Sequence, residues 1–583
     1  MSYIDRIIKN QTTLECDNVH FTESNRGDII KLISNNFSTL KYVNIISNNV
    51  FNKILLNHPS FKHMLLEKLE LNADTLNMPE LNIILKYIKN SSILEHFSLT
   101  KSCNDHVQHQ LIEYLITKTT LKFLMLREVE MSSFDSFYAL SKLICINTSL
   151  EHLDLSSNNL TSNAIHIICT GMKYNMKLRT LILRNNNLYH KGRQNGAFAI
   201  GDMLRFNMSL RKLDLSKCNL RNGVKYVLKS LKRNCTLRKL NISNNNIKDK
   251  VGKILEDALN KNKTLLSLKL KDNNIKKKCW NRFNKIASPN SRLKSLTMLS
   301  DYIDPDMICG IIGTIMFNKN LEKLRIGSFG VMDLYSMQHS EQMIQHTNSG
   351  TLTLEQMIQI QYTNLRTLTL DQMMQHKNLK TLTLENIHIQ SPNAKYLFRG
   401  LAFNSCLRSL TLSNTNMDVL DGGFYYSGDK KKVLNTYDNI TYATDQSRGT
   451  AYLLEAMQSN RTLKYLTLSD GLFDKTSYTN IINIFAVNNT LKKITFNGKY
   501  HDISSENKAL FLNVLNSKYS TIDLTNLCPS HEQSNINMVY FLDKNASSKK
   551  YIKMGLIMKK EEDRNARNEE YENNDEYENN GEY

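Results

Sequence analysis

Residues 150–160 read LEHLDLSSNNL, and the same eleven-residue pattern returns as LRTLILRNNNL at 178–188, LRKLDLSKCNL at 210–220, LRKLNISNNNI at 237–247 and LLSLKLKDNNI at 265–275. All five copies fit the pattern L-x-x-L-x-L-x-x-N/C-x-L. Successive copies start 28, 32, 27 and 28 residues apart (178 − 150, 210 − 178, 237 − 210, 265 − 237). The sequence therefore predicts a tandem array with a period of about 28 residues.

Weaker copies continue the period on both sides of this stretch. They begin at Leu40, Leu66, Leu94 and Leu121, then at Leu293, Leu321, Leu407, Leu463 and Leu491, and the last unit begins at Tyr519. A chain of 583 residues is too long for one ordinary core, because single cores stop growing near about 250–300 residues. A repeat array accounts for the length without many separate domains.

One repeat contains a strand and a helix. In L-x-x-L-x-L the fourth and sixth positions alternate with polar ones, which predicts a short strand with two buried leucines. Between the strands, segments such as 164–176 and 223–235 carry apolar residues at helical spacing. Such a unit cannot bury its apolar face alone, so neighbours must stack. We expect an α/β right-handed solenoid, a horseshoe with a parallel β-sheet on the concave face and helices on the convex face.

The ninth position of each of the five clear copies carries an amide or a thiol. A side-chain amide there can hydrogen-bond backbone groups of the turn in one coil after another, which predicts a structural turn ladder. Its members are Asn158, Asn186, Cys218, Asn245 and Asn273.

The repeats close in an Asn-x-x-Leu motif, as in NTSL at 147–150, NMSL at 207–210 and NCTL at 234–237. With the full helix and the length of 28–29 residues, this resembles the ribonuclease-inhibitor-like class of leucine-rich repeats. That class includes ribonuclease inhibitor, Ran GTPase-activating protein and the repeat regions of NOD-like receptors. The resemblance covers residues 40–530 and implies the architecture, whereas function has to be argued separately.

Departures from the period suggest a division of the chain. Near-copies of EQMIQH between 329 and 378 repeat at too short a spacing for a strand and a helix, and 418–448 lacks the signature although its flanking leucines stay in register. We expect an N-terminal cap at 1–39, regular repeats at 40–328, irregular Gln/Met-rich short repeats at 329–378, repeats at 379–417, a degenerate repeat or inserted loop at 418–448, repeats at 449–530, a C-terminal cap at 531–560 and an acidic disordered tail at 561–583.

The charge is strongly positive and unevenly distributed. Lys and Arg number 75 against 55 Asp and Glu, a net charge of +20, yet residues 561–583 hold ten acidic and two basic residues (2 − 10 = −8). That tail has almost no aliphatic side chains with which to form a core. A basic remainder favours acidic partners, although the abundance of Asn, Lys and Ile also fits compositional drift.

Motifs for enzymatic chemistry are missing from the sequence. We find no Walker loop, dinucleotide fingerprint, HExxH, GxSxG or kinase motif. The spacing of Cys103, His106 and His109 suits a zinc site only weakly, and a solvated helix is the preferred interpretation. We therefore predict a non-enzymatic protein with no catalytic residues, no metal and no cofactor. With ten dispersed cysteines and no signal-peptide or membrane-spanning pattern, we expect it to be cytoplasmic.

The inner face offers a candidate binding surface. Positions three, five and seven of each repeat should face solvent there, and in several coils they are basic, with Asp154 and Asp214 interrupting them. Aromatic side chains look sparse, with Tyr465 almost alone. The predicted partner-binding stripe consists of Arg184, Lys212, Lys239, Lys269, Lys271, Lys323 and Arg325.

Three functions are compatible with this stripe. The first is a protein-interaction scaffold or recognition module, acting as a monomer and binding a protein partner with an acidic surface. The second, which the resemblance implies, is GTPase activation toward a Ran-like small GTPase. The third is nucleic-acid binding, which rests on charge alone. A plainly solvated polar face is the competing interpretation of the stripe. We expect no membrane association.

Overall fold

The computed structural model describes residues 8–9, 13–15, 26–45, 54–72, 76–101, 105–190, 195–275, 292–300, 320–328, 377–385, 391–413, 449–471, 475–498 and 540–543. The chain divides into two units, Met1–Leu321 (unit 1) and Glu322–Tyr583 (unit 2), and each is described by itself.

The strands of unit 1 lie side by side in chain order. From β2 to β12 every neighbouring pair is parallel, and β1 closes the first edge by pairing antiparallel with β2. The strands are β1 (Ile8–Lys9), β2 (Thr13–Glu15), β3 (Tyr42–Ile45), β4 (Lys68–Asn72), β5 (His96–Thr100), β6 (Phe123–Arg127), β7 (His152–Asp154), β8 (Thr180–Ile182), β9 (Lys212–Asp214), β10 (Lys239–Asn241), β11 (Ser267–Lys269) and β12 (Ser295–Ser300).

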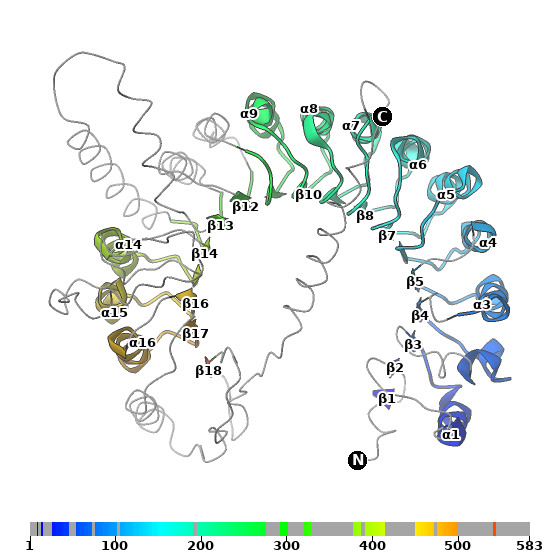
Figure 1. Ribbon diagram of the computed structural model, residues 1–583, viewed down its shortest axis with the longest axis horizontal. Coiled ribbons are helices and arrows are strands. Elements are labelled where there is room, and N and C mark those ends of the chain that lie inside the picture. The colour runs from blue at the N-terminus through cyan, green and yellow to red at the C-terminus, as the bar shows by residue number, and fades with distance from the viewer. Residues whose placement is uncertain are drawn as a thin grey trace, which may run out of the picture. The chain divides into compact units, whose positions relative to one another are not determined.

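A helix follows most of these strands and lies on one side of the sheet only. Within unit 1 the helices form the outer layer of a curved sheet, whose strands line the inner side (Figure 1). The parallel strands alternating with helices on one face confirm the predicted α/β repeat solenoid. The helices are α1 (Arg26–Asn36), α3 (Met78–Asn90), α4 (Asp105–Ile116), α5 (Phe134–Ile146), α6 (Ser162–Tyr174), α7 (Gly196–Phe206), α8 (Val224–Leu231) and α9 (Gly252–Lys261), with short 3₁₀ turns at Phe61–His63, Arg221–Gly223 and Asp249–Val251.

The core is the row of leucines that the repeat pattern places inside. Leu153, Leu181 and Leu213 occupy the fourth position of consecutive repeats, pair in register and are fully buried. Burying one leucine side chain contributes about 1.5–3 kcal/mol. Because each leucine packs between the equivalent residues of two neighbouring repeats, the array is stabilised by contacts along its length.

The turn after each strand has the backbone conformation that its asparagines favour. In the turn 244–246, Asn244 and Asn246 have positive φ angles of 53° and 51°, on either side of the ladder residue Asn245. Asparagine adopts this left-handed conformation more readily than most residues. Asn244 and Asn246 therefore adopt the left-handed conformation that the turn requires, while Asn245 supplies the ladder amide.

The ninth-position side chains lie in one row and hydrogen-bond the turns of neighbouring repeats. The Asn186 Oδ1 accepts from the backbone N–H groups of Asn158 and Leu160 (3.0 and 2.9 Å), and its Nδ2 donates to the carbonyls of Leu155 and Leu183 (3.0 and 2.8 Å). Asn245 and Asn273 repeat this arrangement one coil at a time. The Cys218 Sγ donates to the Leu183 carbonyl at 3.0 Å.

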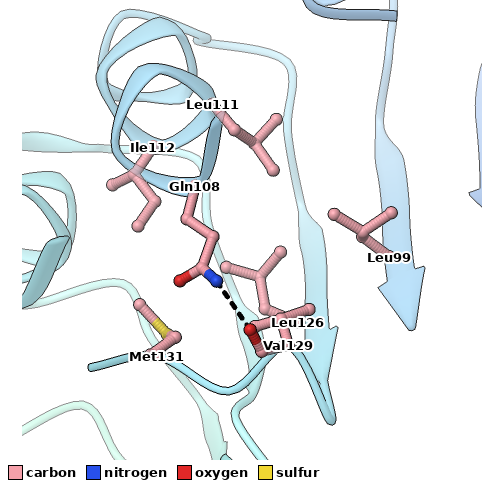
Figure 2. Close-up of a pocket in the computed structure, with 7 residues that line it drawn as sticks. All are labelled: Leu99, Gln108, Leu111, Ile112, Leu126, Val129 and Met131. Atoms are coloured by element: carbon pink, nitrogen blue, oxygen red, sulfur yellow. Dashed lines mark hydrogen bonds between the residues drawn. The ribbon is translucent and has the colours of Figure 1, made fainter. Parts of the chain in front are cut away.

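The ladder ends at Val129, which occupies the ninth position of the preceding repeat. There the Nε2 of Gln108, a buried residue of α4, donates to the Val129 carbonyl at 2.6 Å (Figure 2). The space around this bond is a small apolar recess between α4 and β6, lined by leucine, isoleucine, valine and methionine side chains besides Gln108. A glutamine from the helix thus binds the turn of the repeat whose ninth position has no amide.

Unit 2 repeats the same architecture. From β13 to β17 each strand is parallel to the next, and β18 pairs antiparallel with β17. The helices lie on one side of these strands (Figure 1). The elements are β13 (Lys323–Ser328), β14 (Thr381–Glu385), α14 (Ser391–Phe403), β15 (Ser409–Ser413), α15 (Gly449–Ser459), β16 (Tyr465–Gly471), α16 (Lys475–Val487), β17 (Lys493–Gly498) and β18 (Tyr540–Asp543).

Two strand pairs of unit 2 join residues about twice the usual distance apart in the sequence. β13 pairs directly with β14, and β15 with β16, so that Lys323 is opposite Thr381 and Ser409 is opposite Tyr465. The irregular segment predicted at 329–378, except its last two residues, and the one at 418–448 lie outside the described residues. The same holds for the tail at 561–583 and, apart from β18, for the cap at 531–560. In the described part of the chain, no helix is long and apolar enough to cross a bilayer.

Candidate interaction surface on the strand face

The third position of each repeat projects from the strand face of unit 1, away from the helices. Since neighbouring strands pair without a register shift, these residues form one row, which we call the third-position row. Adjacent strands lie about 4.8 Å apart. In order, the row contains Tyr42, Lys68, His96, Phe123, His152, Thr180, Lys212, Lys239, Ser267 and Ser295.

The structure brings together three residues of the predicted basic stripe. Lys212 and Lys239 are direct neighbours in the third-position row, and both are exposed. Lys269, also exposed, lies two positions further along β11 in the fifth-position row, next to Asn241 of β10. These three lysines form a compact basic group.

Two other members of the stripe do not extend this group as a continuous column. Arg184 and Lys271 occupy the seventh position, but the residues between them in that row are the buried Ser216 and Ser243. Lys271 also lies 3.7 Å from the carboxylate of Asp272. The seventh position is therefore mainly a turn position in these repeats.

The interrupting aspartates have a structural role that the sequence analysis missed. The Asp214 Oδ1 accepts hydrogen bonds from the backbone N–H and the hydroxyl of Ser216, at 2.9 and 2.6 Å. Asp154, which is buried, does the same for Ser156 and also binds Arg127 at 2.9 Å. These carboxylates therefore shape the strand ends, and the charge of Asp154 is paired with that of Arg127.

Lys323 and Arg325 belong to unit 2 and are described with it alone. The Arg325 guanidinium forms a double ion pair with Glu385 of the next strand, with both N–O distances 2.8 Å. Lys323 is exposed and pairs across the sheet with Thr381. The structure therefore does not add these two residues to the basic group of unit 1.

Aromatic rings are more frequent on this face than the sequence analysis predicted. The Phe123 ring stacks between the imidazoles of His96 and His152, with ring centroids 3.9 and 4.1 Å apart. The expectation that Tyr465 is almost alone is therefore wrong. The weaker repeats at Leu94 and Leu121 already carry these rings at their third positions, so counting that position through every copy would have found them.

A hydrogen-bonded carboxylate holds the N-terminal end of the stack. Glu70 accepts from the Tyr42 hydroxyl at 2.7 Å, lies 3.0 Å from the His96 Nε2, and forms an ion pair with Lys68 at 3.2 Å. The Lys68 ammonium also lies 4.1 Å from the centre of the Tyr42 ring. Burial opposes ionisation of Glu70, but the hydrogen bonds from His96, Tyr42 and Lys68 outweigh it and hold its pKa at about 2.

The other end of the stack is uncharged at neutral pH. The pKa of His152 is lowered to about 4, mainly by burial; Asp154 opposes this shift, whereas Lys212 and His96 add to it. The stack therefore ends in a neutral ring, and Thr180 separates it from Lys212. The face carries a row of stacked rings close to concentrated positive charge.

The weak zinc motif is only partly described. His106 and His109 lie on α4, with the His106 Nε2 2.8 Å from the Gln110 amide, while Cys103 lies outside the described residues. Among the described residues, no three His, Cys, Asp or Glu side chains are grouped as metal ligands.

Comparison with known proteins identifies the repeats. A family model described as a leucine-rich repeat matches residues 147–165, 206–223 and 233–250, and the repeats recur in both units. The chain is a leucine-rich repeat protein.

Two curated relatives are similar to this leucine-rich repeat protein. It is 26% identical over 222 residues to mouse (Mus musculus) NACHT, LRR and PYD domains-containing protein 4C, over 38% of this chain and 21% of that protein. It is 24% identical over 219 residues to protein 4E of the same series, over 37% and 21%. The chain thus spans about a fifth of the length of these relatives.

Two solved structures also resemble parts of this leucine-rich repeat protein. Leiomodin-1 actin-binding site 2 is 21% identical, with a TM-score of 0.20, over 22% of this chain and 75% of that one. An internalin from Listeria monocytogenes is 15% identical, with a TM-score of 0.35, over 72% and 89%.

Proposed function

We propose that this leucine-rich repeat protein is a non-enzymatic interaction module and that the strand face of unit 1 binds a protein partner. The observation that carries the proposal is the third-position row, where a stack of three rings lies one residue away from the paired Lys212 and Lys239. Aromatic residues are enriched at protein interfaces, and a patch of positive charge steers acidic surfaces toward it.

The proposed partner has an acidic surface with an apolar or aromatic side chain next to it. The acidic part would face Lys212, Lys239 and Lys269, and the other side chain would contact the Phe123 stack. A strand face built on fully buried leucines changes little on binding, which limits the entropy lost in complex formation. We further propose that the protein is a monomer of the ribonuclease-inhibitor-like class, and light scattering during gel filtration tests the monomer.

A pull-down with matched variants tests the proposal. The triple variant K212E, K239E and K269E should lose the partner, whereas K229E, K250E and K253E, which make the same charge change at exposed residues on the helix side, should retain it. F123S should weaken capture without altering the net charge. Equal capture by both triple variants, with circular dichroism unchanged, would show that the basic group is a solvated surface only.

The two alternatives have separate readouts. Acceleration of GTP hydrolysis by a Ran-like GTPase would favour activation of such a GTPase over a passive module. Retention of RNA or DNA that falls steeply as salt rises would favour nucleic-acid binding. Neither alternative gains a specific site from these side chains. Arg325 is held in a double ion pair with Glu385, and Asp154 and Asp214 hydrogen-bond the turns of their own repeats.

A further inference from the structure

A second surface lies where the helices end, away from the strand face. Each helix of the central repeats is followed by a buried asparagine. The Nδ2 of this asparagine donates to a carbonyl in the last turn of the helix of the previous repeat. Asn207 binds Met172 at 2.7 Å, and Asn234 binds Leu204 at 2.8 Å. These bonds fix the residues before and after each asparagine at equivalent places on the surface of neighbouring repeats.

Around Asn175 and Asn207 both flanking residues are apolar and exposed, and around Asn147 the preceding residue is, while Thr148 follows it. We call these apolar residues the helix-end ridge. It consists of Ile146, Tyr174, Met176, Phe206 and Met208, whose exposed fractions are 55, 75, 62, 54 and 64%.

The ridge is larger than the isolated apolar side chains of an ordinary surface. At about 150–200 Å² for each fully exposed side chain, it offers roughly 500–600 Å² of apolar surface. Contiguous apolar patches of this size on soluble proteins commonly mark binding sites. The ends of α6 and α7 lie close together here, since the ammonium of Lys173, next to Tyr174, lies 5.8 Å from the centre of the Phe206 ring.

The apolar character belongs to these repeats and is not required by the repeat pattern. The equivalent residues around Asn234 are Arg233 and Cys235, and those around Asn262 are Lys261 and Lys263. In unit 2, Phe403 precedes Asn404 at the same place, but the next repeat carries Ser459 and Arg461. The fold therefore tolerates charged residues there, and the ridge has no structural need for its apolar side chains.

The charges around the ridge are mainly positive, although Glu151 is exposed in its first repeat at the position that Arg211 occupies in the third. Lys177, Arg205, Arg211 and Arg233 are exposed beside it. The nearby carboxylate of Asp202 forms an ion pair with Lys173 at 2.6 Å, and that of Asp257 forms one with Lys232 at 3.1 Å. An approaching partner therefore meets an apolar strip bordered mainly by cations.

We propose that the helix-end ridge is a docking surface for an acidic protein segment that carries aromatic or aliphatic side chains. Apolar side chains of the segment pack on Tyr174, Phe206 and the two adaptable methionines, and its carboxylates face the bordering cations. A single-stranded nucleic acid fits less well, because only two of the five ridge residues have a ring on which a base can stack.

Binding of labelled copolymers to the full chain tests this proposal. The probes are fluorescein-labelled poly(Glu,Tyr) and poly-Glu of equal length, followed by fluorescence anisotropy. The full chain should bind poly(Glu,Tyr) at least tenfold more tightly than poly-Glu. Y174S/F206S should lose that difference and bind both alike, whereas F403S, at the equivalent place in unit 2, should retain it.

Three results would overturn the proposal. They are an undiminished preference for poly(Glu,Tyr) in Y174S/F206S, loss of that preference in K212E/K239E/K269E instead, and tighter binding of oligo(dT) than of poly(Glu,Tyr). Should Y174S/F206S fail to fold by circular dichroism, M176S/M208S replaces it with the same expected loss. Since the strand-face variant is part of the same experiment, failure of the ridge is distinguishable from failure of the strand face.

Discussion

Removing the amide of Asn186 tests whether the turn ladder stabilises the array. In N186A the buried N–H groups of Asn158 and Leu160 lose their acceptor, and the Leu155 carbonyl loses its donor. The Leu183 carbonyl retains the Cys218 thiol. A buried group left without a partner costs about 1–3 kcal/mol. With some relaxation of the turn, we expect N186A to lower the free energy of unfolding by about 3–4 kcal/mol.

Two other variants separate the amide from general effects of substitution. Asn187 is exposed and makes one hydrogen bond, to the Asn219 side chain, so N187A should cost less than about 0.5 kcal/mol. N186C introduces the residue that the next repeat carries as Cys218. Since that thiol still donates to a turn carbonyl, N186C should fall between wild type and N186A.

Urea unfolding followed by circular dichroism measures the global loss, and hydrogen exchange locates it. A local loss of 3–4 kcal/mol corresponds to exchange of the Asn158 and Leu160 amides about 100 to 1000 times faster, at about 1.4 kcal/mol for each tenfold change. If N186A cost no more than N187A, or if those two amides exchanged at the wild-type rate, the ladder would be a consequence of the fold and not a cause of its stability.

Two further predictions concern packing and pH. G201A should destabilise the protein by about 1–3 kcal/mol in thermal unfolding, although alanine favours helices. The reason is that a Cβ on Gly201 would lie 2.7 Å from the Tyr226 carbonyl oxygen on the neighbouring helix. A Tm equal to wild type would contradict this close packing. His152 has a folded pKa of about 4, lowered by burial, against 6.5 unperturbed, so the unfolded chain binds more protons between these values. The free energy of unfolding should therefore fall as pH drops from about 6.5 to about 4. Urea titrations at each pH should show a smaller fall over that range for H152F. If the fall were the same in H152F as in wild type, His152 would titrate normally.

Most of the fold could be predicted from the sequence, because the period encodes it directly. The spacing of the leucines determines strand, helix and register, and the paired Leu153, Leu181 and Leu213 lie where the pattern places them. What the pattern could not show is which side chain binds the turn where the ladder ends. Gln108 lies 21 residues before Val129 and reaches it from a helix, a contact that no local spacing indicates.

The candidate sites were less predictable, because a surface depends on which neighbours the stack brings together. The sequence identified Lys212, Lys239 and Lys269 as solvent-facing, yet it could not show that Arg325 is held by Glu385. Phe123 and His96 lie in repeats that fit the signature poorly, so their third positions were not counted, although His152 lies in one of the clearest copies. The helix-end ridge was hidden because Tyr174 and Met176 fall within the apolar pattern of a helix that buries most of such residues.

The substitution at Cys218 has a mechanical consequence. On one side of it, the Leu160 N–H binds the Asn186 amide oxygen, whereas at Cys218 the corresponding N–H of Leu188 binds a main-chain carbonyl at 3.1 Å instead. A thiol is a weaker acceptor than an amide oxygen. When the array is pulled from its ends in an optical trap, we expect the contact between the repeats on either side of Cys218 to break first. The repeats before and after Cys218 should then unfold in two separate steps.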